Sequence, residues 1–306
     1  MSMSRNNGIS PGYNPEIRKF KIRSGIETLV FVVPALLLLI IFKIYPILLS
    51  FFGSFFTESF LTGKTLFVGF ENYVSLFRDS IFINSLIVTL KFNLITTPVQ
   101  IVIALILDLL VLKPSRTSSI FRVIFMMPIA IALTSACMLW NIMLNPNQGI
   151  VNSILGLVGI DAQPFFTSKT QAMMSMILIC NWRGCGYWML YLLTGIQDVS
   201  QSVLESARID GAGRLRTIWS IILPMIKRSM MFVVVSDTIS NLLMFIPVHM
   251  ITLGGPEGST DLIMYEAYKT GFVYADFGKS YAMVSLLIIF AFAVVMVEMK
   301  LLKPKY

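Results

Sequence analysis

Long apolar stretches alternate with shorter polar segments along the whole chain. A helix needs roughly 20 mostly apolar residues to cross a hydrocarbon core of about 30 Å, and six stretches are long enough. The predicted spans are residues 28–52, 83–111, 121–144, 171–195, 225–249 and 280–301. The pattern therefore predicts an all-α, polytopic membrane protein with six transmembrane helices.

The basic residues of the polar segments are unevenly divided between the two sides of this bundle. Because cytoplasmic loops are enriched in Lys and Arg, the side with more of them, which includes both termini, is expected to be cytoplasmic. That side contains Arg5, Arg18, Lys19, Lys21, Arg23, Lys113, Arg116, Arg122, Arg208, Arg214, Arg216, Lys227, Arg228, Lys300, Lys303 and Lys305, and the opposite side contains Lys64, Arg78, Lys169, Lys269 and Lys279.

The same boundaries predict the organisation of the chain. Residues 1–27 form a basic cytoplasmic N-terminus, residues 28–301 form one membrane domain, and residues 302–306 form a cytoplasmic tail. The first span is too long for the apolar part of a signal peptide and has no small-residue cleavage site after it, so we expect an uncleaved anchor. The aromatic segment 53–82 is expected to form a short interfacial helix on the outer side.

Composition excludes a soluble domain and gives no sign of a nucleic-acid or metal site. Of the 306 residues, 56% are hydrophobic and only 13% are charged, whereas a soluble domain has roughly 25% charged residues. The net charge of +8 is spread between the spans rather than gathered into one patch, which argues against nucleic-acid binding. Three cysteines inside apolar segments form neither a disulfide framework nor a zinc motif. We therefore expect packing residues and no metal.

The polar segment 197–224, between the fourth and fifth predicted spans, has a distinctive pattern. Three residues separate Glu205-Ser206-Ala207 from Gly211, and nine more separate Gly211 from Ile221-Ile222-Leu223-Pro224. Apolar residues recur at roughly helical spacing, which predicts an amphipathic helical segment that bends at the glycine. These residues are Leu204, Ala207, Ile209, Ala212, Leu215 and Ile218.

Such a segment suits a groove on a partner protein. The alternative is an ordinary amphipathic helix on the membrane surface, where Glu205 and Asp210 would face anionic headgroups unfavourably.

This pattern resembles the EAA loop of ABC importer permeases, E-A-A-x3-G-x9-I-x-L-P, with Ser206 in place of an alanine. The resemblance implies a type I ABC importer permease fold, in which this cytoplasmic coupling loop docks onto ATP-binding subunits. Two such subunits would bind and hydrolyse ATP, and this chain itself would need no cofactor. The residues that the resemblance assigns to coupling are Glu205, Ser206, Ala207, Asp210, Gly211, Ala212, Leu223 and Pro224.

A second motif lies between the fifth and sixth spans. Thr252-Leu253-Gly254-Gly255-Pro256 resembles the T-x-G-G-P signature of carbohydrate importer permeases similar to the larger maltose permease subunit, and the run Asp276-Phe277-Gly278 is similar to the stretch before their last span. Phe245 also matches, but Ile246 stands where the family often has aspartate.

The resemblance implies a multi-pass protein of a prokaryotic plasma or inner membrane. It would form half of the pathway for a sugar or oligosaccharide. A second permease subunit and an extracellular solute-binding protein would be its partners. Other cargoes remain open at this point: a polyol, glycerol-phosphate or an amino acid.

Polar and aromatic residues inside the spans are candidates for the substrate pathway, since charged groups at this depth usually face a cavity or pair with one another. Arg183 and Asp237 lie near the middle of spans four and five, at depths that would allow a salt bridge. The alternative role is hydrogen bonding between packed helices. The candidates are Arg183, Tyr187 and Tyr191 in span four and Asp237, Asn241 and Phe245 in span five, with a further polar face of Asn93, Thr96, Thr97 and Gln100 in span two.

Two other classes of membrane protein fit the sequence less well. An intramembrane enzyme needs a catalytic constellation, and the chain has a single histidine, His249, and no G-x-x-x-x-G-K-[ST] phosphate loop. We therefore expect no enzymatic activity. A channel or proton-coupled transporter would have no use for an EAA loop.

Overall fold

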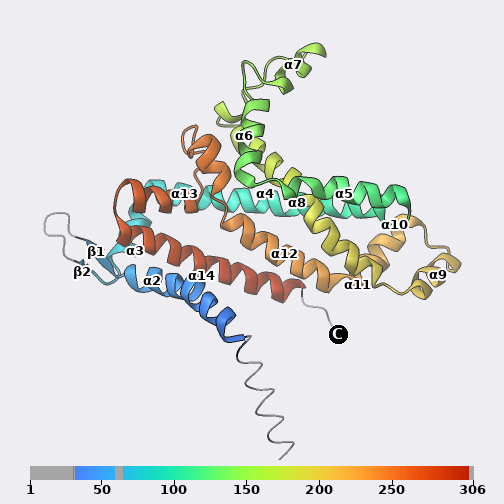
Figure 1. Ribbon diagram of the computed structural model, residues 1–306, viewed down its shortest axis with the longest axis horizontal. Coiled ribbons are helices and arrows are strands. Elements are labelled where there is room, and N and C mark those ends of the chain that lie inside the picture. Colours follow the sequence, from blue (N-terminus) through green and yellow to red (C-terminus); the bar gives the residue numbers. More distant parts are fainter. Residues whose placement is uncertain (1–29, 31, 59–64, 303–306) are drawn as a thin grey trace, which may run out of the picture. The chain divides into compact units, whose positions relative to one another are not determined.

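The computed structural model describes residue 30, residues 32–58 and residues 65–302. The predicted N-terminal segment 1–27 and most of the predicted tail lie outside these residues. The chain divides into two compact units, Met1–Phe52 and Gly53–Tyr306 (Figure 1).

The described part of the first unit is an apolar helix that belongs to the candidate span Val32–Gly53. It contains a π-helical turn, Ile40–Ile44, followed by α2 (Tyr45–Gly53). Most of its large apolar side chains are exposed, including Phe42 and Phe52. Exposed apolar side chains along a helix of this length are expected where the surrounding medium is lipid.

The second unit is a helical bundle with one small antiparallel sheet. Its long helices are α4 (Ser80–Val111), α8 (Ala172–Gln197) and α14 (Phe277–Leu302). Shorter helices are α3 (Glu71–Arg78), α5 (Arg116–Ala130), α6 (Leu133–Met143), α7 (Ile150–Leu157), α9 (Gln201–Ile209), α10 (Arg214–Thr217), α11 (Leu223–Met225), α12 (Lys227–Leu242) and α13 (Ile263–Tyr268), with η2 (Phe165–Thr167) as a 3-10 turn and η3 (Ile218–Ile222), η4 (Val248–Thr252) and η5 (Lys269–Val273) as π-helical turns.

Two of the predicted spans are not continuous helices. The third is broken between α5 and α6, which meet at 95°, close to Pro128 in the last turn of α5. The fifth is broken at Ile226, where the segments Leu215–Met225 and Lys227–Leu242 are bent by 75°, and α12 then ends at Leu242. By length and composition, three described helices qualify to cross a membrane, or five if each bent pair counts as one span.

Helix α8 occupies the predicted fourth span. It is not one of the described helices that are apolar enough to qualify as membrane spans. It is long enough, but Asn181, Arg183 and several glycines occupy its middle. A span with this many polar groups is expected to face other helices or a cavity rather than lipid. The buried clusters agree, because α8 residues such as Met176 and Leu192 are fully enclosed by neighbouring helices.

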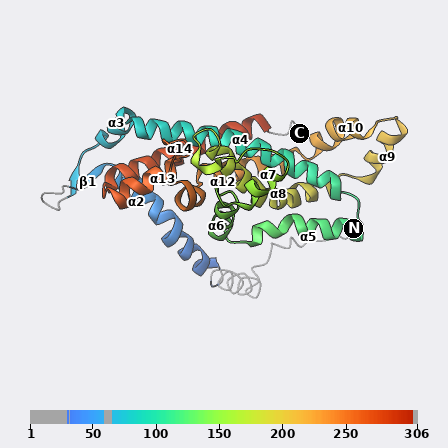
Figure 2. The same cartoon turned by 90° about the horizontal axis from the view of Figure 1, so that it is seen from above.

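The two ends of the second unit differ (Figures 1 and 2). Helices α9 and α10 lie at one end. At the opposite end lie α3 and the two-stranded sheet of β1 (Phe56–Glu58) and β2 (Thr65–Phe67), in which Phe56 pairs with Phe67. The segment 53–82, expected to hold a short helix, therefore contains α3 and also a small sheet that the prediction of an all-helical chain missed.

Two glycines of α8 allow its neighbours to approach closely. A Cβ atom at Gly186 would overlap the backbone carbonyl of Phe125 in α5, and one at Gly184 would overlap the amide of Gln100 in α4. Small residues at such contacts let helix backbones pack against each other in membranes. Helix α8 thus contacts the backbone of α5 at Gly186 and the side-chain amide of Gln100 in α4 at Gly184.

Candidate functional site

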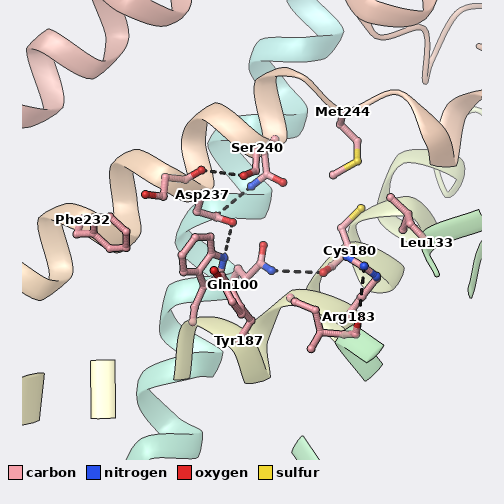
Figure 3. A pocket seen from close by; sticks show the side chains of 14 residues that line it. Gln100, Leu133, Cys180, Arg183, Tyr187, Phe232, Asp237, Ser240 and Met244 are labelled. Atoms are coloured by element: carbon pink, nitrogen blue, oxygen red, sulfur yellow. Dashed lines mark hydrogen bonds between the residues drawn. The ribbon is translucent and has the colours of Figure 1, made fainter. Parts of the chain in front are cut away.

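A cavity of about 350 Å³ lies where α4, α8 and α12 meet the broken third span (Figure 3). Its polar lining comes mainly from one face of α8 and one face of α12, and its apolar lining includes residues on both sides of the α5–α6 bend. The lining residues are Gln100, Ile129, Leu133, Cys180, Arg183, Gly184, Tyr187, Trp188, Phe232, Ser236, Asp237, Ser240, Asn241 and Met244.

Four of the six predicted pathway residues line this cavity: Arg183, Tyr187, Asp237 and Asn241. Their convergence follows from helical geometry, since residues four apart lie on one face. Tyr191, one turn further along α8, instead lines a smaller cavity of about 280 Å³ with Thr194, Arg228, Ser229 and Phe232. Phe232 lines both cavities, so the two adjoin.

Phe245 is not among the lining residues of either cavity, and its predicted place in the substrate pathway stays a prediction. Helix α12 ends at Leu242, so the helical spacing that placed Phe245 on the same face as Asp237 does not continue that far. Its ring stacks on His249 at a centroid distance of 5.0 Å and also contacts Tyr268 at 5.2 Å. Phe245 therefore belongs to an aromatic cluster beyond the end of α12.

Asp237 is the centre of a buried polar network. Its side chain is 2% exposed. Oδ1 accepts a hydrogen bond from Trp188 Nε1 at 2.7 Å, and Oδ2 accepts one from Asn241 Nδ2 at 3.0 Å. Asn241 Nδ2 also donates to Thr97 Oγ1 at 2.9 Å. The network therefore ties α12 to both α8 and α4, and it gives each oxygen of the carboxyl group a donor.

Arg183 does not pair with Asp237. Its Nε donates to the carbonyl of Ile131 at 3.3 Å and its Nη2 to the carbonyl of Ile129 at 3.5 Å. These carbonyls flank Ala130, the last residue of α5, where the helix leaves its final carbonyl groups without intrahelical partners. Figure 3 shows the Arg183 side chain beside Cys180 and apart from Asp237.

The predicted polar face of span two is divided between the cavity and the helix contacts. Gln100 lines the cavity and donates to the carbonyl of Cys180 at 3.4 Å. Asn93 donates to the carbonyl of Thr238 at 2.9 Å, and Thr97 accepts from Asn241. Thr96 Oγ1 is buried and has no hydrogen-bond partner in the described part of the chain. Asn93 and Thr97 thus connect α4 to α12.

Sequence reasoning missed several lining residues. Ser236 and Ser240 follow the same spacing on α12 as Asp237 and Asn241, one position earlier, and this signal was available. Ile129 and Leu133 reach the cavity only because the third span bends between them. No pattern in the sequence gave the direction of that bend.

The predicted coupling loop forms a compact turn between two short helices. Helix α9 ends at Ile209, Asp210 is its C-cap, and Gly211 has φ of 74°. The amide of Ala212 donates to the carbonyl of Ala207 at 2.9 Å, and that of Gly211 donates to Arg208 at 3.1 Å. A glycine in the left-handed region is the usual way to end a helix in this manner.

Further along, α10 leads through η3 into the short helix α11, with Pro224 in its first turn, a position where proline costs no hydrogen bond.

The exposed surface of this loop differs from the predicted amphipathic pattern. Ala207 is buried, and Leu204 and Ile218 pack against the cluster of Ile196, Val199, Ile222 and Ile226. Ile209 and Leu215, which the spacing placed on the same face, are 86% and 73% exposed. The spacing assumed continuous helix geometry, and the turn at Gly211 ends it. Glu205, Ser206 and Asp210 are also exposed, so the loop presents two apolar side chains next to polar and acidic ones.

The glycine-rich motif, residues 252–256, forms a loop that follows the C-terminal end of α12 and is held by side-chain hydrogen bonds. Thr260 Oγ1 donates to the carbonyl of Gly255 at 2.6 Å and contacts Thr252 Oγ1 at 2.7 Å. Lys269 forms ion pairs with Asp261 and Glu266. Burial and, to a smaller extent, the hydrogen bond with Glu266 raise the pKa of Asp261 and Lys269 lowers it, which gives a pKa of about 7.

Comparisons with known proteins agree with these features. Residues 18–306 match the family described as "Binding-protein-dependent transport system inner membrane component". The chain belongs to this family. It is therefore a multi-pass membrane transport component rather than an enzyme.

Its relatives include an sn-glycerol-3-phosphate transport system permease protein, UgpA, of Agrobacterium fabrum, which is 30% identical over 275 residues, 90% of this chain and 94% of the relative. A probable ABC transporter permease protein of Bacillus subtilis, YurN, is 30% identical over 89% of this chain and 94% of its own length.

The fold also matches a solved structure. A chain of a bacterial alginate ABC transporter, crystallised with an alginate pentasaccharide-bound periplasmic protein, superimposes with a TM-score of 0.76. It covers 92% of this chain and 96% of that one at 19% identity. At this identity the likeness shows the fold, and it supports the ABC importer permease architecture expected from the EAA pattern.

Proposed function

We propose that this chain is a carbohydrate-importer permease subunit that forms half of a translocation pathway. The observation that carries the proposal is the cavity between α8 and α12, in which Arg183, Tyr187, Asp237 and Asn241 converge from the two spans that flank the EAA-type loop. Hydroxyl groups of a sugar need hydrogen-bond partners, and the aromatic rings of Tyr187 and Trp188 suit its flatter faces.

The cargo class is supported by the relatives as well as by the lining. UgpA is named for sn-glycerol-3-phosphate and the fold neighbour for alginate. An amino acid is a weaker candidate, because the glycine-rich motif resembles that of the carbohydrate branch. Sugars and phosphorylated polyols thus form the range of cargoes for this chain.

In this proposal the remaining subunits are a second permease, two cytoplasmic ATP-binding subunits and an extracellular solute-binding protein. The loop of α9 and α10 docks into a groove of one ATP-binding subunit. Its two exposed apolar side chains, Ile209 and Leu215, supply buried contact area, and Glu205 and Asp210 meet cationic or amide groups. The basic residues beside this loop support a cytoplasmic location for it and for both termini.

A matched pair of variants tests the docking surface. Ile209 and Leu157 are 86% and 85% exposed, but they lie on α9 and at the end of α7. Ile209→Asp should reduce the amount of ATP-binding subunit that copurifies with the membrane complex, whereas Leu157→Asp should leave it unchanged. Equal retention in both variants would contradict docking through this loop.

The cavity is tested separately in proteoliposomes. Tyr187→Ala should keep the ATP-binding subunits attached and lower sugar uptake, because Tyr187 lines the cavity and is remote in sequence from the loop. Unchanged uptake kinetics would remove this residue from the pathway.

A further inference from the structure

The two charged residues of the cavity differ in what they offer to a ligand. Asp237 is almost completely buried, and both of its oxygens accept hydrogen bonds from protein donors. Arg183 is only half-buried and lines the same cavity. Within the described ranges, no carboxylate lies within ion-pair distance of its guanidinium group. The cavity therefore presents a cation that has no carboxylate partner in the described part of the chain, next to a buried acid each of whose oxygens accepts a hydrogen bond from the protein.

The hydrogen bonds of Arg183 do not account for its charge. The two bonds to Ile129 and Ile131 are 3.5 and 3.3 Å long, at or beyond the long end of the usual range for N–H···O bonds. A guanidinium group has five N–H donors, so three remain. Glutamine, whose Nε2 lies at the same place along the side chain as arginine Nε, could donate to the carbonyl of Ile131 without a charge. A role in capping α5 thus explains the donors but gives no reason for a cation.

A cation at this depth is costly to keep. Arg183 is close to the middle of α8, far from either end of the helix. Since insertion of one costs roughly 2.5–3.5 kcal/mol, ionisable residues inside a membrane span usually pair with an opposite charge or with backbone carbonyls, or face a water-filled cavity, and they mark substrate pathways. Here the side chain faces the cavity, where a bound anion would supply the missing partner.

We propose that the cavity binds a carbohydrate that carries an anionic group, such as a carboxylate, phosphate or sulfate ester, and that Arg183 binds this group. This inference rests on the proposed function and narrows its substrate class. The planar guanidinium group matches the oxygens of such anions with two parallel hydrogen bonds. Ser236 and Ser240, which line the facing side of the cavity on α12, provide hydroxyl groups for the neutral part of the sugar.

The test compares ligands that carry an anionic group with neutral counterparts that lack it. The complete complex of both permeases and the ATP-binding subunits is purified in lipid nanodiscs. Equilibrium binding is measured for two matched pairs: digalacturonate with its neutral counterpart digalactose, and glycerol 3-phosphate with glycerol. Uptake of the same four compounds is measured in proteoliposomes supplied with the binding protein.

Three variants separate the effect of the charge at position 183 from the effect of its hydrogen bonds and from the effect of the protein's net charge. Arg183→Gln removes the charge and keeps a donor for the carbonyl of Ile131, and Arg183→Lys keeps the charge. Arg228→Gln is the control, because Arg228 lines only the smaller neighbouring cavity. Retention of the ATP-binding subunits confirms that each variant is folded and assembled.

We expect the wild-type complex to bind the acidic member of at least one pair about 30-fold more tightly than the neutral one, as for a close charge pair shielded from water. Arg183→Gln should reduce this preference to within about threefold without changing the affinity for the neutral member. Arg228→Gln should keep the full preference, and Arg183→Lys, which keeps the charge but loses the two parallel hydrogen bonds, should keep only part of it. Equal binding of both members by the wild type, or a preference that survives Arg183→Gln, would overturn the proposal.

Failure of the broader function has a different signature. If neutral sugars bind and are taken up while acidic ones are not preferred, the permease assignment stands and only the anion specificity is wrong. If no carbohydrate of either charge binds or is taken up, the proposed function fails together with this inference.

Discussion

Removing the indole donor of Trp188 tests the network around Asp237. In Trp188→Phe the aromatic ring is kept, but Asp237 Oδ1 loses the donor that lies 2.7 Å away. Hydrogen bonds between neutral groups of membrane helices contribute about 0.6 kcal/mol on average, and bonds to charged groups contribute about 1.5–3 kcal/mol. The Trp188 bond is short, and both of its residues are buried. We therefore expect a loss of about 1.5 kcal/mol.

The matched control is Trp140→Phe. Trp140 Nε1 is also buried, but it has no hydrogen-bond partner within the described ranges. The substitution makes the same change in ring size and leaves no acceptor without its donor, so it should cost less than Trp188→Phe or even be stabilising. Both variants are compared by titrating the detergent-purified chain with SDS and following the loss of helical circular dichroism.

A double-mutant cycle identifies the partner. In an Asp237→Asn background the cost of Trp188→Phe should decrease, because the carboxyl group that made the bond strong is gone. The reasoning is refuted if Trp188→Phe and Trp140→Phe cost the same, or if the cost of Trp188→Phe is unchanged by Asp237→Asn.

Two further predictions concern the loops. Gly211 has φ of 74° and open space around it, so Gly211→Ala should cost about 1–2 kcal/mol of backbone strain and increase proteolysis between α9 and α10. Gly213 also has open space around it but no positive φ, so Gly213→Ala should not increase proteolysis. Equal proteolysis of the two variants would contradict this. The folded-state pKa of Asp261, about 7, lies above its ordinary value of 3.8. Its contribution to stability is therefore complete below pH 3.8 and decreases as the pH rises through about 7. Intrinsic-rate-corrected amide exchange in residues 252–269 should accelerate over that range, and Asp261→Asn should remove the acceleration.

Much of the cavity could be predicted because it depends on local periodicity. Arg183 and Tyr187 are four residues apart on one continuous helix, as are Asp237 and Asn241 on another, and each pair faces the cavity. Phe245 was misplaced because its helix ends three residues earlier, at Leu242. Periodicity holds only as far as the helix does.

The parts that could not be predicted depend on where helices break. Helical spacing in the sequence placed Ile209 on the same apolar face as Ala207. The turn at Gly211 ends the helix and leaves Ile209 exposed. The pairing of Arg183 was open from sequence, since its depth equals that of Asp237. Its partners are carbonyl groups freed by the end of α5, and these become available only through the bend that follows.

The close packing at Gly184 and Gly186 limits how the protein can move during transport. At Gly186 the backbone of α8 is in direct contact with that of α5 and cannot slide without steric collision, so these two helices should travel as one block. The contact of α8 with α12 is different, because it consists of apolar side-chain packing around Val233 and of the hydrogen bond from Trp188 to Asp237, which can break and re-form. We expect a displacement of the α9–α10 loop to move α12 away from that block, so that the cavity opens between its polar faces on α8 and α12.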